Sequence, residues 1–287
     1  MKRPIVRLSS LQLTNIKNVK NGTIYMPNTV NKILSADKAE ILGIYGQNGS
    51  GKTAIVDALY FLQKVMVGAD LDQSLEDYMT IDSDTAEIFA DFNIFMDGIV
   101  FEIGYTLSLS REEKEIVINR EILRSAKNEN GIRTNKTTFM DYQRDQTDVI
   151  FKPQKRLDEI LEANKEIKTD LIVARKMAEK SNCSYIFGES SREIFCREYK
   201  NGFQQFSVII SSLFEFALKD LFVIRNTHSG VISANFVLPM AFRIENDNIG
   251  AKGDFAVPLT EPILVDEERK NLLETIVEQI NICLLYT

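Results

Sequence analysis

The chain has 287 residues, of which 44% are hydrophobic and 26% are charged, so it can bury a core and does not have the composition of a disordered protein. Its 34 basic and 41 acidic residues give a net charge of −7, which excludes a uniformly basic nucleic-acid-binding coat. No apolar run reaches the roughly 18 residues of a membrane span, and no apolar stretch follows the basic N-terminus as in a signal peptide. We therefore expect no membrane contact and a cytoplasmic protein whose three cysteines, without metal-ligand spacing, are reduced: Cys183, Cys196 and Cys283.

The first third of the chain predicts two strands, a buried strand and a helix. Alternating apolar residues over 5–26 predict an antiparallel strand pair with its turn near Asn21 and Gly22. Residues 40–45 form a short apolar run before a glycine-rich segment, which predicts a buried strand. Apolar residues at helical spacing follow from Thr53, so we expect a helix to about Val67.

The middle of the chain is rich in Ile, Phe, Val and Tyr, which predicts three antiparallel strands over residues 87–95, 100–109 and 115–123. Residues 127–136 are polar and contain a glycine, which predicts an exposed turn or the tip of a long hairpin. Further along, we expect one or two amphipathic helices over 154–180, helices over 206–222 and 268–284, and strands at 222–225 and 235–243. This order predicts an α/β fold with an antiparallel β subdomain and a helical region.

One motif in the sequence has a definite chemistry. Residues 46–53 fit the phosphate-loop pattern G-x-x-x-x-G-K-[ST] without a mismatch. The glycines let successive backbone N–H groups turn toward phosphate oxygens, Lys52 supplies a positive charge to the β and γ phosphates, and the Thr53 hydroxyl can bind Mg²⁺. The predicted nucleotide-binding residues are Gly46, Gln47, Asn48, Gly49, Ser50, Gly51, Lys52 and Thr53.

Chance alone explains this motif poorly. Average residue usage would produce such a match in a chain of this length with a probability of roughly 1%. The match also lies between a predicted buried strand and a predicted helix, which is the context that phosphate loops require. We therefore predict a P-loop nucleotide-binding protein.

Two stretches of the sequence, one before the phosphate loop and one that includes it, resemble a known family of ATPases. Residues 11–17, with Asn15, Ile16 and Lys17 at their end, and residues 46–62, in which Asp57 follows the loop, resemble the ABC-type ATPase heads of the SMC, RecF and OLD-like proteins. Ile16 stands where that family usually has an aromatic residue. The resemblance implies ATP and Mg²⁺ as cofactors, a head-to-head homodimer, and DNA or an effector protein as candidate partners. An antiparallel β subdomain after the first helix is compatible with it.

The second half of such a head is not evident in the sequence. Asp266 and Glu267 follow three apolar residues and could form a Walker B motif, or they could be the cap and acidic first turn of the last helix. Pro262 shortens the strand that a Walker B motif needs, and residues 248–253 do not fit the serine-glycine signature. We therefore expect residues 1–125 to be the N-terminal part of the ATPase head and residues 126–287 to be mostly helical, in a chain that represents part of a longer protein.

Several lesser candidates have two interpretations each. His228, the only histidine, is expected in a loop rather than in catalysis. Gln143 and Gln146 could sense Mg²⁺ or lie in a solvated loop. Lys17 and Lys20 could contact a phosphate or a nucleic acid, or be ordinary surface lysines.

Three functions are compatible with these observations. The first is an ATP-driven switch in DNA maintenance or in defence against invading DNA. The second is a nucleotide-binding regulatory module without turnover, and the absence of a convincing catalytic half predicts very slow hydrolysis by this chain. The third is a P-loop kinase, which ranks last because its loop usually lies near the N-terminus.

Overall fold

The computed structural model describes residues 3–71, 78–112, 115–152, 154–198, 203–223, 235–238 and 255–258. The chain divides into a unit over Met1–Leu218 and a second unit over Lys219–Thr287. Of the second unit, the described strands are β9 (Asn235–Leu238) and β10 (Phe255–Pro258), which pair antiparallel. The predicted helix over 268–284 lies outside the described residues. Of the predicted strand over 222–225, the last two residues also lie outside them.

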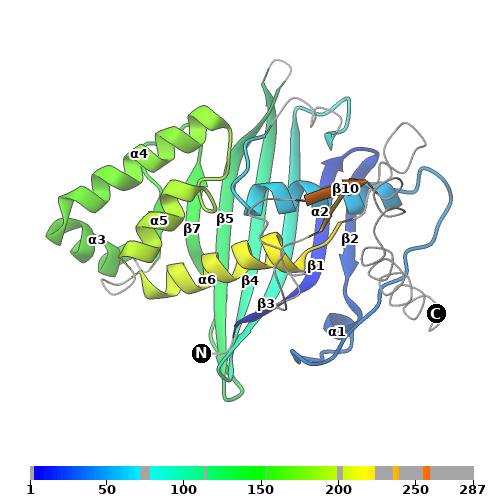
Figure 1. Ribbon diagram of the computed structural model, residues 1–287, viewed down its shortest axis with the longest axis horizontal. Coiled ribbons are helices and arrows are strands. Elements are labelled where there is room, and N and C mark those ends of the chain that lie inside the picture. The colour runs from blue at the N-terminus through cyan, green and yellow to red at the C-terminus, as the bar shows by residue number, and fades with distance from the viewer. Residues whose placement is uncertain are drawn as a thin grey trace. The chain divides into compact units, whose positions relative to one another are not determined.

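The first unit contains one antiparallel sheet with the strand order β2-β1-β3-β4-β5-β7-β8, and β6 pairs with β5. Figure 1 shows the long strands of this sheet with helices α2 and α6 passing across it. The strands are β1 (Ile5–Ile16), β2 (Val19–Tyr25), β3 (Thr85–Met96), β4 (Ile99–Glu112), β5 (Glu115–Glu129), β6 (Ile132–Arg133), β7 (Thr137–Gln143) and β8 (Ile150–Phe151).

Helices α1 and α2 lie between β2 and β3 in the sequence, and the other helices follow β8. The helices are α1 (Pro27–Val30), α2 (Lys52–Met66), α3 (Gln154–Ala163), α4 (Lys165–Ser181), α5 (Glu189–Arg197) and α6 (Gln204–Glu215), and a π-helical turn over Phe216–Asp220 extends α6. The α2 helix, the three middle strands and the helices expected over 154–180 confirm the predictions. The whole is of the α/β class that the sequence predicts.

Two tight turns organise the middle of the sheet. Asp97-Gly98 joins β3 to β4, and Asn130-Gly131 joins β5 to β6, with positive φ at all four residues. Positive φ at both central positions is the condition for a type I′ turn, whose twist matches that of the flanking strands. The predicted hairpin tip over 127–136 is therefore confirmed.

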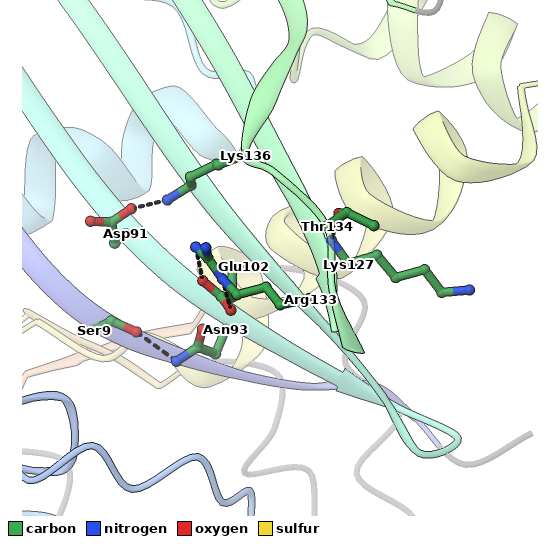
Figure 2. Close-up of polar contacts among 8 residues, drawn as sticks. All are labelled: Ser9, Asp91, Asn93, Glu102, Lys127, Arg133, Thr134 and Lys136. Atoms are coloured by element: carbon green, nitrogen blue, oxygen red, sulfur yellow. Dashed lines mark hydrogen bonds and ion pairs between the residues drawn. The ribbon is translucent and has the colours of Figure 1, made fainter. Parts of the chain in front are cut away.

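The two faces of the sheet differ in chemistry. Aromatic contacts join the sheet to the helical layer: Phe92 packs against Phe216, Tyr105 against Phe187, and Phe139 against Phe206. The opposite face carries polar side chains that contact one another across strands (Figure 2). Arg133 binds Glu102 through two hydrogen bonds of 2.7 Å, Lys136 reaches Asp91, and Asn93 donates to Ser9.

Two predictions in the first third of the chain are wrong. The β1–β2 turn lies at Lys17 and Asn18, because Ile16 pairs with Val19, and Asn21 and Gly22 lie inside β2. Residues 40–45 form no strand, and Ile41, Ile44 and Tyr45 are 56%, 39% and 86% exposed. A short strand needs ladder partners to offset its loss of conformational entropy, and residues 40–45 pair with none of the described strands.

No described helix combines the length and the apolar character that crossing a membrane requires. Cys183 and Cys196 are free thiols, and Cys283 lies outside the described residues. Burial raises the pKa of the Cys183 thiol to about 11, so this cysteine stays protonated at neutral pH.

Candidate functional site

The phosphate-loop motif folds into an exposed loop that runs directly into α2. Gly49 and Gly51 have φ values of +82° and +92°, a conformation that side-chain-bearing residues rarely adopt. Gly51 is the N-terminal cap of α2, and no side chain caps this end of the helix. The loop glycines are therefore placed where the sequence predicts the backbone to turn, in front of a helix N-terminus.

Lys52 folds back over the loop. Its Nζ atom donates to the Gly46 carbonyl at 2.6 Å and to the Gln47 carbonyl at 2.7 Å, and lies 3.4 Å from the Ser50 hydroxyl. The Ser50 amide also donates to the Gln47 carbonyl, at 3.2 Å. The lysine ammonium and a loop N–H thus both point toward the inside of the loop, where they contact loop oxygens.

These residues fit a phosphate group. An ammonium, the inward N–H of Ser50 and an uncapped helix N-terminus together form an anion-binding arrangement. Thr53 lies in the first turn of α2 with its side chain exposed, which is compatible with the predicted Mg²⁺ ligand. Among the residues that the structure describes, no group of three His, Cys, Asp or Glu side chains could hold a metal by itself.

The tip of the β1–β2 hairpin lies against this loop. The Asn18 side-chain amide donates to the Gly49 carbonyl, and the Lys17 ammonium binds the Asp57 carboxylate on α2. Asp57 is only 3% exposed and lies on the buried face of the helix between Ala54 and Ala58. The Lys17 ammonium also lies 5.4 Å from the centre of the Tyr78 ring. Lys17 is therefore engaged with the helix, and Lys20 is exposed in β2.

The sequence pattern does not identify Asn18, because it places the hairpin turn at Asn21 and Gly22. A turn at Lys17 and Asn18 would have indicated that these two side chains project from the end of the hairpin. Their partners, Gly49 and Asp57, are distant in the sequence, so no local pattern identifies them.

The other predicted candidates do not gather at the loop. Gln143 ends β7, and the amide of Gln146 donates to its carbonyl at 3.2 Å in the turn that follows. In the sheet, β7 is four strands away from β1, which corresponds to about 19 Å. His228, Asp266 and Glu267 lie outside the described residues, so their predicted roles stay predictions.

Comparison with known families agrees with this geometry. Residues 41–170 match the family described as "AAA domain, putative AbiEii toxin, Type IV TA system". The matched stretch includes the phosphate loop, α2 and the strands from β3 to β8, and is similar to the nucleotide-binding domain of an AAA-type P-loop ATPase. It covers less than half of the chain. No curated protein matches the chain.

Proposed function

We propose that this protein binds ATP with Mg²⁺ through residues 46–53 and acts as an ATP-dependent switch. The observation that carries the proposal is the loop at the uncapped N-terminus of α2, with the Lys52 ammonium directed into it. The family match over residues 41–170 supports nucleotide binding by the same stretch.

Each part of the loop makes a different contact with a bound triphosphate. Lys52 exchanges its bonds to the Gly46 and Gln47 carbonyls for phosphate oxygens, which are stronger acceptors because they are charged. The Thr53 hydroxyl holds Mg²⁺, and the α2 dipole favours the negative charge. Cleavage of the phosphoanhydride bond in the bound nucleotide would switch the protein from one state to the other.

We further propose that the protein works as an SMC/RecF/OLD-like ATPase head of the ABC type. The resemblance of residues 11–17 and 46–62, and the three antiparallel strands after α2, support this narrower assignment. In such a switch, ATP would join two heads of a homodimer. DNA or an effector protein would be the partner, in cytoplasmic DNA maintenance or anti-phage defence.

Calorimetric titration with Mg-ATP tests the binding site. Lys52→Ala should weaken binding by about 1.5–3 kcal/mol, because it removes a charge-assisted contact. Thr53→Ala should weaken binding mainly when Mg²⁺ is present, because the proposed role of its hydroxyl is to bind the metal. Lys176→Ala, which removes an exposed lysine of α4, is the matched control and should bind as the wild type does. Equal affinity for wild type and Lys52→Ala would refute the site.

A phosphate-release assay distinguishes the switch from a regulatory module without turnover. Turnover in P-loop ATPases needs a positioned water and a carboxylate besides the loop. Asp266 and Glu267 are the sequence candidates for that role. Turnover that disappears in Glu267→Gln would identify them as a Walker B motif, whereas background release from both proteins would favour the regulatory module.

A further inference from the structure

The tip of the β1–β2 hairpin, formed by Lys17, Asn18 and Val19, contacts the phosphate loop and α2 at three points. Lys17 binds Asp57 on α2, and Asn18 donates to the Gly49 carbonyl. Val19 packs so closely on Gly51 that a Cβ atom there would lie 2.6 Å from Val19 Cγ2. The tip therefore contacts the loop at its centre and where it enters the helix.

The hairpin tip is itself fixed from the other side by the segment that precedes β3. The Lys17 amide donates to the Tyr78 carbonyl at 2.8 Å, and the Thr80 hydroxyl donates to the Lys17 carbonyl at 2.6 Å. The Thr80 amide donates to the Asn15 carbonyl at 2.9 Å. Asn15 and Lys17 have φ values of +55° and +51°, which a lysine adopts only when its surroundings impose it. These contacts hold the tip in place, and with it the Asn18 side chain that binds the Gly49 carbonyl.

The Asn18 contact sets the direction of one peptide group in the loop. The Gly49 carbonyl and the Ser50 N–H belong to the same planar peptide unit and point in opposite directions. Because Asn18 holds the carbonyl outward, the Ser50 N–H points to the inside of the loop, where it meets the Gln47 carbonyl. The Cβ position of Gly49 lies in open space, so no side chain packs on that side of the residue, and the peptide is held by the Asn18 contact and by the Ser50–Gln47 hydrogen bond.

We propose that Asn18 is a positioning residue that prepares the loop to bind polyphosphate. It keeps the peptide between Gly49 and Ser50 in the orientation that presents its N–H to a phosphate, so that binding does not have to order it. This inference rests on the proposed function and adds a residue outside the P-loop motif to the site. One neutral hydrogen bond contributes about 1 kcal/mol, so its loss should weaken binding about fivefold.

The test measures binding of Mg-ATP and of Mg-tripolyphosphate by calorimetry, with thermal unfolding of each protein without ligand. Asn18→Ala removes the donor and should bind both ligands about fivefold more weakly, by the same factor, because Asn18 acts on the phosphate cradle and not on the base. Asn18→Gln retains an amide and should recover most of the affinity. Asn21→Ala is the matched control, since Asn21 lies on the same hairpin and its side-chain carbonyl accepts a hydrogen bond from the Thr14 hydroxyl at 3.2 Å.

The outcomes separate this inference from the proposed function. Unchanged affinity of Asn18→Ala, no recovery in Asn18→Gln, or an equal loss in Asn21→Ala would overturn the role of Asn18 while Lys52→Ala still reports on the site. A loss for ATP without a loss for tripolyphosphate would also overturn it. A wild type that binds neither ligand would overturn the proposed function and this inference together.

Discussion

At the scale of single residues, two loop glycines with similar backbone conformations have different surroundings. Gly49 and Gly51 both have positive φ, but only the Cβ position of Gly51 collides with a neighbour, Val19. Substituting alanine at either position costs about 1 kcal/mol for the backbone conformation. At Gly51 the collision adds to this cost, because Val19 is fixed in a strand next to the hairpin turn.

We therefore predict that Gly51→Ala loses more stability and more nucleotide affinity than Gly49→Ala. Chemical denaturation without ligand and calorimetric titration of the two variants measure the difference. The pair is matched, since both changes add one methyl group at positive φ within the same loop. Equal losses in the two variants would show that contact with Val19 contributes nothing.

The glycine-rich loop in front of α2 could be predicted from the sequence, because the chemistry of phosphate binding fixes both residue types and spacing in the motif. Asn18 and the Lys17–Asp57 pair could not be predicted in the same way. Their roles depend on the register of β1 and β2, and a shift of the turn by a few residues changes which side chains lie at the tip.

At the scale of secondary-structure elements, a buried carboxylate attaches the helical layer to the sheet. Glu121 of β5 is fully buried, with an exposed fraction of 0%. Its Oε1 atom accepts from the Tyr105 and Ser184 hydroxyls, each at 2.6 Å, and its Oε2 atom accepts from the Tyr185 amide at 2.7 Å. Ser184 and Tyr185 belong to the segment between α4 and α5, so one side chain fixes this connection against the sheet.

Glu121→Ala should strongly destabilise the fold, because it leaves two hydroxyls and a backbone amide buried without their acceptor. Each such group costs about 1–3 kcal/mol. Glu121→Gln should cost much less, since its carbonyl can accept from the amides and its NH₂ group can donate to the hydroxyl oxygens. Urea denaturation measures both variants, and equal losses of unfolding free energy would contradict this role.

The same carboxylate makes stability depend on pH. Burial raises the pKa of Glu121 above its ordinary value, although the Ser184 and Tyr105 hydroxyls oppose the shift. The folded protein therefore retains this proton at a pH where the unfolded chain has lost it, and stability falls as pH rises from the ordinary glutamate pKa through the raised one. Denaturation at several pH values should show that Glu121→Gln lacks this part of the decrease.

Elements differed in how well their sequences predicted them. The β3–β4 and β5–β6 turns contain Asp-Gly and Asn-Gly, which are strong local signals. The strand β7 was not predicted, because its buried residues Phe139, Met140 and Tyr142 do not alternate regularly and its pairing with β5 shifts register at Leu123. The sequence predicts helix α2 but not its whole buried face. That face includes Ala54, Asp57 and Ala58, which are small or charged and so contribute little to a hydrophobic pattern.

At the scale of the whole molecule, the sequence predicted the type of architecture better than its arrangement. Local periodicity identified the antiparallel strands and the helices. It could not place β1 between β2 and β3, because that order depends on pairing between distant parts of the chain. It also predicted a strand over 40–45 from a short apolar run before the glycine-rich segment, a pattern that does not show whether a neighbouring strand is present.

The position of β1 has a consequence for how the protein folds. Strands β3, β4 and β5 pair with their neighbours along the chain, so they can form quickly through short connections. In contrast, Thr14 of β1 pairs with Glu87 of β3, and the phosphate loop and α2 lie in the long segment between them. Closing that segment carries an entropic cost that is recovered only when β3 is available. During synthesis from the N-terminus, the phosphate loop therefore leaves the ribosome before the strand that completes its support, and nucleotide binding follows assembly of the sheet.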